Sequence, residues 1–385
     1  MKIVIAPNAF KGSMTAAEAA RAMATGIKKI LPDAEVVQVP VADGGDGLVE
    51  IANQALQGEI RKLLVTGPCF DLVEAQFCLV PSMQFAAIEM ALASGIVLLP
   101  NKQRDPTKTT TFGTGELIAA ALDLGVRRIA VGIGGSATND GGIGMAAALG
   151  VRFLNANGQA VKPVGGTLTD IRRIDMAGLD SRINDVRFEV VCDVDNPLIG
   201  PAGAAQVYGP QKGATPEQVK VLDQGLANLA DVIASDLGFD VRNLAGAGAA
   251  GGLGAGLYAF LGAELKRGVD MVLNLVGLDE KLHGADLVLT GEGQIDSQTA
   301  FGKAPAGVAI AAEKQNIPCI AIAGSVGEQL DTLYPCGINA VFSLCPGPLS
   351  LDQAMNRGQQ YLAGTTEQAV RCFLAGQNRP CNQTD

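Results

Sequence analysis

Val131–Met145 reads VGIGGSATNDGGIGM, and the rest of the chain is organised around this stretch. The apolar run Arg128–Ile133 predicts a strand that ends in two glycines, and the run Ile143–Leu149 predicts a helix. Glycines after a strand let backbone N–H groups converge, and the positive end of the next helix adds to their field, so the stretch suits a phosphate or carboxylate. Asp140 would repel such an anion unless a metal ion lay between them. The stretch therefore predicts a metal-bridged phosphate site, whereas a plain tight turn is the usual explanation of a lone glycine-rich loop.

Polar, glycine-rich loops recur along the chain, which favours a site over a plain turn. They are Ala42–Gly47 (ADGGDG), Gly246–Gly256 (GAGAAGGLGAG) and Thr290–Asp296 (TGEGQID). Glycine makes up 49 of the 385 residues, well above the average of about 7%. Because this excess follows apolar runs, it is typical of α/β enzymes rather than of low-complexity chains.

The order of predicted elements indicates an α/β fold with a parallel sheet. A strand at Lys2–Ala6, a helix that opens with the capping box Thr15–Glu18, and a strand at Glu35–Pro40 form a β-α-β unit. The same rhythm returns from Ala285–Thr290 onward. Between these parts, short alternating runs predict antiparallel strands at Arg61–Thr66, Glu74–Val80 and Phe85–Met90.

This order predicts a sheet domain that is divided in sequence. Residues 1–55 and 283–385 form the α/β sheet domain, and residues 56–282 form a mixed α/β domain inserted into it. The polar tail 376–385 is expected to be disordered.

Charge and composition exclude several classes of protein. The net charge of −10 argues against nucleic acid or an anionic membrane as a partner. The eight cysteines show no CxxC pair, which is typical of reduced thiols in a cytoplasmic protein. The sequence shows no signal peptide, and its weakly polar stretch Leu244–Gly262 is too rich in glycine for a transmembrane helix. A homo-oligomer is left open.

Loops after parallel strands predict one shared cleft. In an open parallel sheet, ligands gather at the carboxyl ends of the strands. We expect the loops at 8–13, 43–47, 291–296 and 324–325 to meet there and face the inserted domain.

The residue types in these loops suit phosphoryl transfer, which needs positive charge on the transferred group, a divalent metal and a group that receives a hydroxyl proton. Lys11 is the leading cation, although an ordinary surface lysine is the alternative, and Lys212 and Lys303 come second. Two or more of the loop acids could hold Mg2+, and one could act as general base. These acids are Asp43, Asp140, Asp193, Asp195, Glu292 and Asp296. Asp43 and Asp140 both precede helices and could instead be helix caps.

Other nucleotide motifs are missing or weak. The sequence contains no Walker motif GxxxxGK[ST]. The GxG at Gly246–Gly248 does not follow a strand, and that at Gly291–Gly293 holds a glutamate that would oppose a pyrophosphate. Neither supports a dehydrogenase.

Several long blocks resemble the bacterial glycerate kinases of the glycerate and glucarate utilisation type (type 1). They are Ala6–Ser13 (APNAFKGS), Val41–Gly47 (VADGGDG), Gly132–Gly144 (GIGGSATNDGGIG), Asp193–Gly213 (DVDNPLIGPAGAAQVYGPQKG), Gly246–Leu257 and Thr290–Lys303 (TGEGQIDSQTAFGK). They cover nearly the whole chain in order. Asn8-Ala9 stands where many members read Asp-Ser, which puts a role for position 8 in doubt.

The resemblance implies ATP-dependent phosphorylation of D-glycerate with Mg2+, in organic acid catabolism. The 2-phosphate product is favoured and the 3-phosphate stays open. The family's fold is described as a flavodoxin-like (Rossmann-like) domain that carries an inserted domain likened to restriction enzymes.

On the matching positions we assign roles as hypotheses. Lys11 contacts the transferred phosphoryl group, Asp43 or Asp193 activates the glycerate hydroxyl, and Mg2+ is held by Asp195, Glu292 and Asp296. Substrate and phosphate contacts are assigned to Ser13, Gly44, Gly45, Gly134, Gly135, Ser136, Asn139, Asp140, Asn196, Lys212, Gly251, Gly252 and Lys303. Two alternatives stay open: a kinase of another small hydroxy acid, and a non-catalytic regulator that binds a nucleotide or sugar acid.

Overall fold

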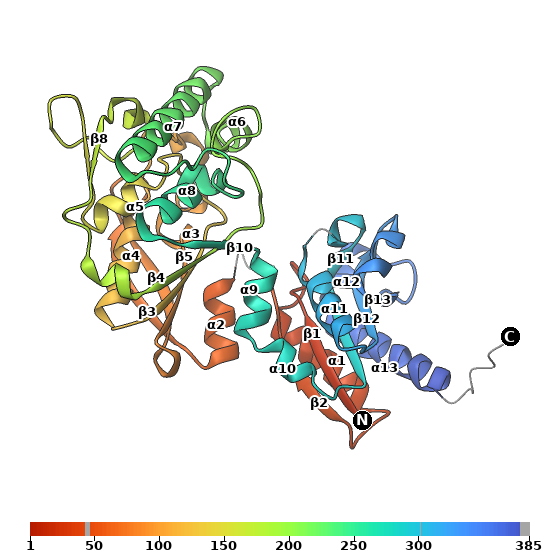
Figure 1. Cartoon of the computed structure of the whole chain (residues 1–385). Coiled ribbons are helices and arrows are strands. Elements are labelled where there is room, and N and C mark those ends of the chain that lie inside the picture. Colours follow the sequence, from red (N-terminus) through yellow and green to blue (C-terminus); the bar gives the residue numbers. More distant parts are fainter. Residues whose placement is uncertain (43–46, 301, 378–385) are drawn as a thin grey trace, which may run out of the picture. The chain divides into compact units, whose positions relative to one another are not determined.

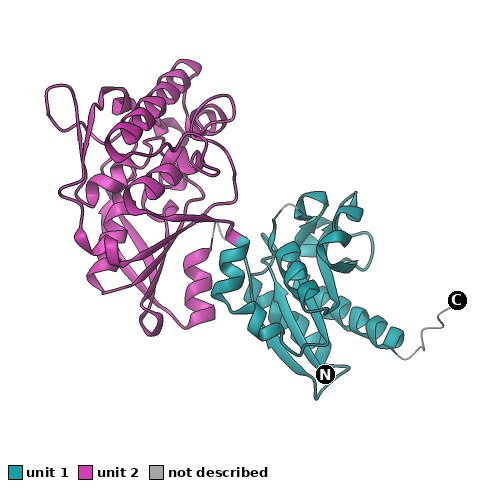
Figure 2. Ribbon diagram, in the orientation of Figure 1, with its two compact units in different colours: residues 1–43, 269–385 teal, residues 44–268 magenta. Residues whose placement is uncertain are grey.

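The computed structural model describes residues 1–42, 47–300 and 302–377. Figure 1 shows its elements, and Figure 2 colours its two compact units. Unit 1 comprises Met1–Asp43 and Val269–Asp385, and unit 2 comprises Gly44–Gly268. The boundaries predicted from the sequence lie at 55/56 and 282/283, and the division into separately folding domains stays a prediction.

Unit 1 is built on a five-stranded parallel sheet in the order β13-β12-β11-β1-β2. Numbered along the chain within this unit, the order is 2-1-3-4-5, which is that of flavodoxin. Its strands are β1 (Lys2–Pro7), β2 (Glu35–Gln38), β11 (Leu287–Ile295), β12 (Cys319–Val326) and β13 (Ile338–Ser343). The predicted fold class, a split flavodoxin-like sheet with an inserted mixed α/β part, is confirmed.

Helices α1 (Ala16–Lys28) and α13 (Gly358–Gln377) pack against each other and against the sheet of unit 1. Thr15 and Glu18 form the predicted capping box, because the amide of Glu18 donates to the Thr15 hydroxyl over 3.2 Å and the amide of Thr15 donates to the Glu18 carboxylate over 2.8 Å. Unit 1 also contains α9 (Gly268–Leu275), α10 (Leu278–Leu282), α11 (Ala304–Lys314) and α12 (Leu351–Asn356). The first residue of α9, Gly268, is assigned to unit 2.

The C-terminal part differs from the sequence-based expectation. The sequence predicts one helix from Leu351 to about Leu374, but the chain breaks near Arg357 into α12 and α13. Gly376 and Gln377, predicted to belong to a disordered tail, are the last residues of α13. Residues 378–385 lie outside the described residues.

Unit 2 contains a six-stranded mixed sheet in the order β10-β9-β6-β5-β4-β3. The first four of these strands are parallel neighbours, and β4 pairs antiparallel with both β5 and β3, as the turn signals predicted. The strands are β3 (Glu59–Thr66), β4 (Leu72–Val80), β5 (Phe85–Glu89), β6 (Arg128–Gly132), β9 (Arg187–Val191) and β10 (Glu264–Lys266). A separate two-stranded sheet is formed by β7 (Arg152–Leu154) and β8 (Arg173–Asp175), which pair antiparallel.

Helices bury the aliphatic core of unit 2. They are α3 (Ala91–Ser94), α4 (Phe112–Asp123), α5 (Ile143–Ala148), α6 (Ala204–Tyr208), α7 (Pro216–Leu237) and α8 (Ala249–Leu261), while α2 (Leu48–Leu56) contacts β4 and β5. Helix α7 begins after Thr215, which forms a second capping box with Gln218. The four parallel strands direct their carboxyl ends to one edge of the sheet, and the loops after β6 and β9 begin there.

Candidate active site

A cavity of about 420 Å³ lies in unit 2 where β6 and β9 end. Its polar lining side chains are Arg104, Ser136, Asp193, Tyr208, Gln211 and Lys212. Gly134, Gly135, Ala249 and Ala250 also line it. Of the predicted site residues, the structure therefore brings Gly134, Gly135, Ser136, Asp193 and Lys212 together around one cavity. This position agrees with the rule that ligands bind beyond the carboxyl ends of parallel strands.

Lys212 is the buried cation of this cavity. Lys212 is the last residue of the short 3₁₀ helix Pro210–Lys212 and is only 2% exposed. The ammonium group donates a hydrogen bond to the carbonyl oxygen of Thr138 over 2.7 Å. Burial lowers the pKa of Lys212 to about 7, and the nearby carboxylate of Asp140 only partly opposes this shift. Lys212 can therefore gain or lose its charge near neutral pH, depending on what binds beside it.

Asp193 brings a carboxylate to the same cavity. It lies two residues beyond the end of β9, and its Oδ1 accepts a hydrogen bond from the amide of Gly268 over 2.9 Å. Gly268 follows β10 closely, so the pairing of β10 with β9 brings this amide to Asp193. The carboxylate is thus oriented by a backbone donor while it remains exposed enough to meet a substrate.

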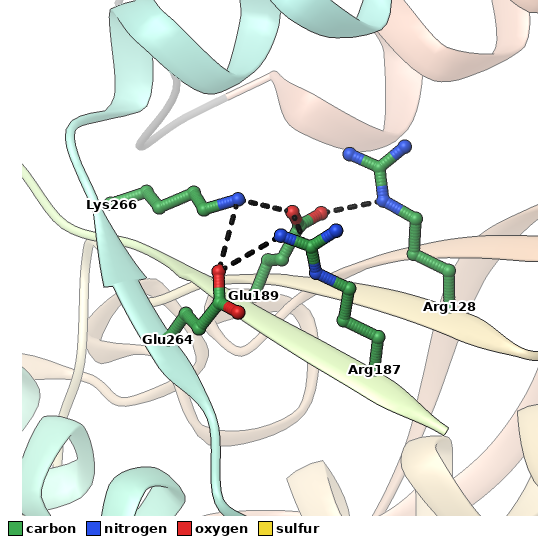
Figure 3. Close-up of polar contacts among 5 residues, drawn as sticks. All are labelled: Arg128, Arg187, Glu189, Glu264 and Lys266. Carbon is green, nitrogen blue, oxygen red and sulfur yellow. Dashed lines mark hydrogen bonds and ion pairs between the residues drawn. The ribbon is translucent and has the colours of Figure 1, made fainter. Parts of the chain in front are cut away.

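An ion-pair network joins the strands that carry this part of the site (Figure 3). Glu189, which is 1% exposed, accepts hydrogen bonds from Lys266 over 2.5 Å and from Arg128 over 2.6 Å. Arg187 pairs with Glu264 over 3.0 Å and approaches Glu189 at 3.6 Å. Burial raises the pKa of Glu189, but the hydrogen bonds from Lys266 and Arg128 outweigh it, so the pKa lies below its ordinary value. Neighbouring β6, β9 and β10 are therefore tied together by charge.

Asn196 acts on the cavity through Tyr208. Its side-chain carbonyl accepts a hydrogen bond from the Tyr208 hydroxyl over 2.6 Å, and its amide donates to the carbonyl of Ala202 over 2.8 Å. Burial raises the pKa of Tyr208, so the phenol stays protonated at neutral pH. Asn196 thus orients a cavity residue, and a direct contact with substrate stays a prediction.

Asp140 makes its contacts within the protein, in the loop before α5, although the N-cap residue of that helix is Gly142. Its fully buried carboxylate accepts hydrogen bonds from the amide and hydroxyl of Thr111, both at 2.8 Å, and from the amides of Gly142 and Gly144 at 3.1 and 3.2 Å. Burial raises the pKa of Asp140, although these hydrogen bonds oppose the shift. With four protein donors on its oxygens, Asp140 fixes the loop before α5 and does not line the cavity.

Thr138 and Asn139 lie buried in the same loop and keep unused polar atoms. The Thr138 hydroxyl and both amide atoms of Asn139 have no hydrogen-bond partner among the described residues. Buried polar groups in proteins are nearly always paired. These atoms therefore mark the loop as unusual, although neither residue lines the cavity.

The predicted glycine cradle contains a left-handed backbone run. Ala250, Gly251 and Gly252 have φ values of 52, 71 and 89° inside α8. A Cβ on Gly251 would lie 2.0 Å from the carbonyl oxygen of Thr138, so only glycine fits there. Ala250 adopts the left-handed region with a side chain, which costs roughly 1–2 kcal/mol. The run packs α8 against the loop after β6 and places Ala250 in the wall of the cavity.

In unit 1, the loop after β1 lies beside the C-terminal half of β11. The amide of Asn8 donates to the carbonyl of Gly291 over 2.8 Å, and a Cβ on Gly293 would lie 3.4 Å from the amide nitrogen of Lys11. Lys11 itself is exposed. Ser13 instead donates its hydroxyl to the carbonyl of Met355 over 2.8 Å, which anchors the region of α12. The geometry gives Ser13 a structural contact, and its predicted phosphate contact stays a prediction.

Two predicted metal ligands and one predicted cation lie close together at the end of β11 and in the segment that follows it. The ammonium group of Lys303 lies 3.9 Å from a carboxylate oxygen of both Glu292 and Asp296. Glu292 is 6% exposed and accepts a hydrogen bond from the Thr299 hydroxyl over 2.8 Å. Two carboxylates that converge on one cation suit Mg2+, which takes one or two protein carboxylates together with phosphate oxygens and water. The donor set therefore fits this metal, although the described residues contain no cluster of three or more His, Cys, Asp or Glu side chains suited to one.

The remaining predicted residues are not placed in either of these two groups. Asp195, the third predicted metal ligand, is an exposed residue of unit 2, whereas Glu292 and Asp296 belong to unit 1. Its place in the metal set stays a prediction, as does the single cleft that was to unite loops of both units. Asp43, Gly44 and Gly45 lie outside the described residues.

The cavity residues that sequence reasoning missed include Arg104, Tyr208, Gln211 and Ala250. Tyr208 and Gln211 lie in the block Asp193–Gly213 quoted above, so the block itself was the available signal. Arg104 lies between turn residues with no motif around it, and no local signal marked it. None of the helices in the described part of the chain is long and apolar enough to span a membrane.

Comparison with known proteins shows the family to which the chain belongs. The sequence model of the glycerate kinase family matches residues 3–374. A glycerate kinase of Halalkalibacterium halodurans is 52% identical, with 96% of each chain covered, and a glycerate 2-kinase of Escherichia coli K12 is 49% identical over 92% of this chain and 93% of its own. The crystal structure of a protein assigned as glycerate kinase 2 of Salmonella typhimurium LT2 superposes with a TM-score of 0.90 at 48% identity, covering 98% of this chain and all of that one. The chain therefore belongs to the glycerate kinase family and is an enzyme of that family.

Proposed function

We propose that this enzyme transfers the γ-phosphoryl group of ATP to D-glycerate and that its product is the 2-phosphate. Family membership across nearly the whole chain supports the reaction. The similarity to the Escherichia coli protein named glycerate 2-kinase, at 49% identity, supports the position of transfer.

The observation that carries the proposal is the meeting of Asp193 with Lys212 at one cavity. Glycerate has a carboxylate and neighbouring hydroxyl groups, so it needs both a cation and a proton acceptor. Asp193 receives the proton of the attacking hydroxyl, and the amide of Gly268 keeps its carboxylate oriented for this step. Lys212, with the backbone at Gly134 and Gly135 and the hydroxyl of Ser136, binds the negative group of the ligand. Asp43 stays the alternative proton acceptor.

The loops of unit 1 are proposed to serve the phosphates of ATP. Lys11 and Lys303 supply positive charge to the transferred group, and Glu292 and Asp296 hold Mg2+. When bound, the metal neutralises charge that develops on the phosphate oxygens. The ammonium group of Lys303 forms ion pairs with the carboxylates of Glu292 and Asp296 in the absence of a metal ion.

We also propose a cellular setting for this enzyme. The resemblance to the glycerate and glucarate utilisation type supports a role in organic acid catabolism, and the absence of disulfides among the described cysteines supports a cytoplasmic location. A homo-oligomer stays open.

One experiment tests both the reaction and its position. Purified full-length protein is incubated with ATP, Mg2+ and D-glycerate, and the product is identified by phosphorus NMR, with L-lactate and D-glucarate as comparison acceptors. We expect ADP release that depends on D-glycerate and a single 2-phosphoglycerate signal. A 3-phosphoglycerate signal would correct the position, and faster turnover of another hydroxy acid would replace the substrate. Binding of glycerate or ATP without turnover would favour a non-catalytic regulator.

A further inference from the structure

The guanidinium group of Arg104 has an unusual environment. It lines the cavity of unit 2, and its Nε atom is buried without a hydrogen-bond partner. Within residues 1–42, 47–300 and 302–377, no carboxylate pairs with it and no side-chain hydrogen bond engages it. Arginine carries five N–H donors in a planar fork that matches a carboxylate or phosphate. A partly buried guanidinium with all of its donors unused is therefore suited to a ligand.

The fold holds Arg104 beside the turn that carries Lys212. A Cβ on Gly213 would lie 2.3 Å from the carbonyl oxygen of Arg104, and Gly213 has a φ of 93°. Only glycine allows this approach, so the backbone after Lys212 lies directly against Arg104. Next to Arg104, the Asp105 carboxylate accepts a hydrogen bond from the Gln218 side chain in the first turn of α7, over 3.1 Å. The close approach of Gly213 to Arg104 and the hydrogen bond from Gln218 to Asp105 thus hold Arg104 and Lys212 at the same wall of the cavity.

The other ionisable groups at the cavity define the charge of the ligand. Asp193 contributes one carboxylate, while Tyr208 and Cys192 remain neutral because burial raises the pKa of both side chains. Behind Lys212, Asp140 is occupied by four protein donors. Arg104 and Lys212 therefore attract an anion, whereas Asp193 suits a hydroxyl group and repels a polyphosphate.

We infer that Arg104 and Lys212 form a carboxylate-binding subsite in unit 2 and that Arg104 determines the selectivity for hydroxy acids over uncharged polyols. This inference rests on the proposed function, because it assigns the acceptor rather than ATP to this cavity. Arg104 binds the carboxylate through its fork, and Lys212 adds a second donor without leaving Thr138. The acceptor's hydroxyl groups then face Asp193 across the same cavity.

The test uses Arg104→Gln in the full chain, with Lys102→Gln as the matched control. Lys102 is an exposed cation two residues away that does not line the cavity. Binding of D-glycerate and of its uncharged amide, glyceramide, is measured by calorimetry without nucleotide, and KM values for D-glycerate and ATP are measured separately. Circular dichroism and thermal melting establish that each variant is folded.

We expect Arg104→Gln to weaken D-glycerate binding about 10- to 100-fold, as for loss of a charged hydrogen-bond pair. Binding of glyceramide, KM for ATP and all properties of Lys102→Gln should stay within about twofold of the wild type. An unchanged D-glycerate affinity, or a raised KM for ATP with unchanged KM for glycerate, would overturn the inference. If the wild type binds D-glycerate through Arg104 but does not phosphorylate it, the subsite stands and the proposed function fails.

Discussion

The carboxylate of Glu189 and the ammonium group of Lys266, on neighbouring strands of unit 2, lie 2.5 Å apart. Lys266 is the last residue of β10, and its carbonyl oxygen accepts a hydrogen bond from the amide of Cys192 over 3.0 Å. Asp193 follows Cys192 directly and receives its own hydrogen bond from Gly268. The ion pair therefore fixes the strand register on which the position of Asp193 depends.

Replacing Glu189 by Gln should lower the stability of the protein. Glu189 is 1% exposed, and its removal leaves Lys266 and Arg128 without their shared counter-charge at 30% exposure each. We expect a loss of about 2–3 kcal/mol, below the usual cost of breaking a fully buried pair. Denaturant unfolding measures it, and Glu264→Gln, at an exposed position of the same network, should have a much smaller effect.

Glu189 should also make the stability of the folded protein depend on pH in the acidic range. Because the pKa of Glu189 in the folded protein is below its ordinary value, its contribution to stability is present above the unfolded pKa and is lost as the pH falls through the folded pKa. Below pH 4.5, the wild type should therefore lose stability more steeply than Glu189→Gln. Equal slopes for the two proteins would contradict the assigned pKa.

Lys212 predicts a pH dependence of the same direction in a higher pH range, because its pKa is also lowered on folding. Its pKa falls from 10.5 to about 7 on folding, so between these values the unfolded chain binds more protons than the folded one. Stability should therefore rise as the pH increases from 7 toward 10, by up to roughly 4 kcal/mol. In Lys212→Met this rise should be largely absent, whereas Lys102→Met should retain it. Unfolding free energies at pH 6.5, 8 and 9.5 decide between these outcomes.

Asp193→Asn should reduce kcat with little effect on folding. The amide can no longer take the hydroxyl proton, which typically costs a factor of about 10²–10⁴. Its carbonyl oxygen can still accept the hydrogen bond from Gly268, so the melting temperature should stay within a few degrees. Asp43→Asn is the matched comparison, and if it shows the large loss while Asp193→Asn does not, Asp43 is the base.

Asp140→Ala should behave in the opposite way and lose stability before it loses specific activity. Its side chain satisfies four buried donors, which would be left without partners. We expect a cost of about 3 kcal/mol or more, measured by thermal and denaturant unfolding. Asp195→Ala, at an exposed position, is the control and should change stability little. A stable Asp140→Ala protein with impaired turnover would restore Asp140 to the substrate site.

Gly251→Ala should disrupt the loop contact behind the cavity. The new Cβ would meet the Thr138 carbonyl oxygen at 2.0 Å and the Asn139 Cα at 2.6 Å, so the backbone must move. The expected cost is several kcal/mol, beyond the roughly 1–2 kcal/mol of the left-handed conformation alone. Gly262→Ala isolates that smaller cost, because Gly262 has a φ of 65° with no atom near its Cβ position. Similar losses for both variants would show that the loop yields easily.

Sequence alone determined what depends on local chemistry and on periodicity. The capping boxes at Thr15 and Thr215 start helices because their side chains bond to backbone groups three residues away. The apolar runs became strands, and the resemblance of whole blocks identified the family, since long ordered motifs are specific. The polar residues after β6 and β9 were recognised as site candidates for the same reason.

Tertiary structure alone decided which of those candidates share a cavity and what each one does. Asp140 and Asp193 are both acids that follow a strand, yet Asp140 is buried and accepts four hydrogen bonds, whereas Asp193 is exposed and lines the cavity. Arg104 carries no local signal, and it reaches the cavity because Gly213, more than a hundred positions later in the sequence, allows close backbone approach. Burial and hydrogen-bond partners are set by contacts between distant segments, and these contacts decide whether a polar side chain stabilises the fold or stays available to a substrate.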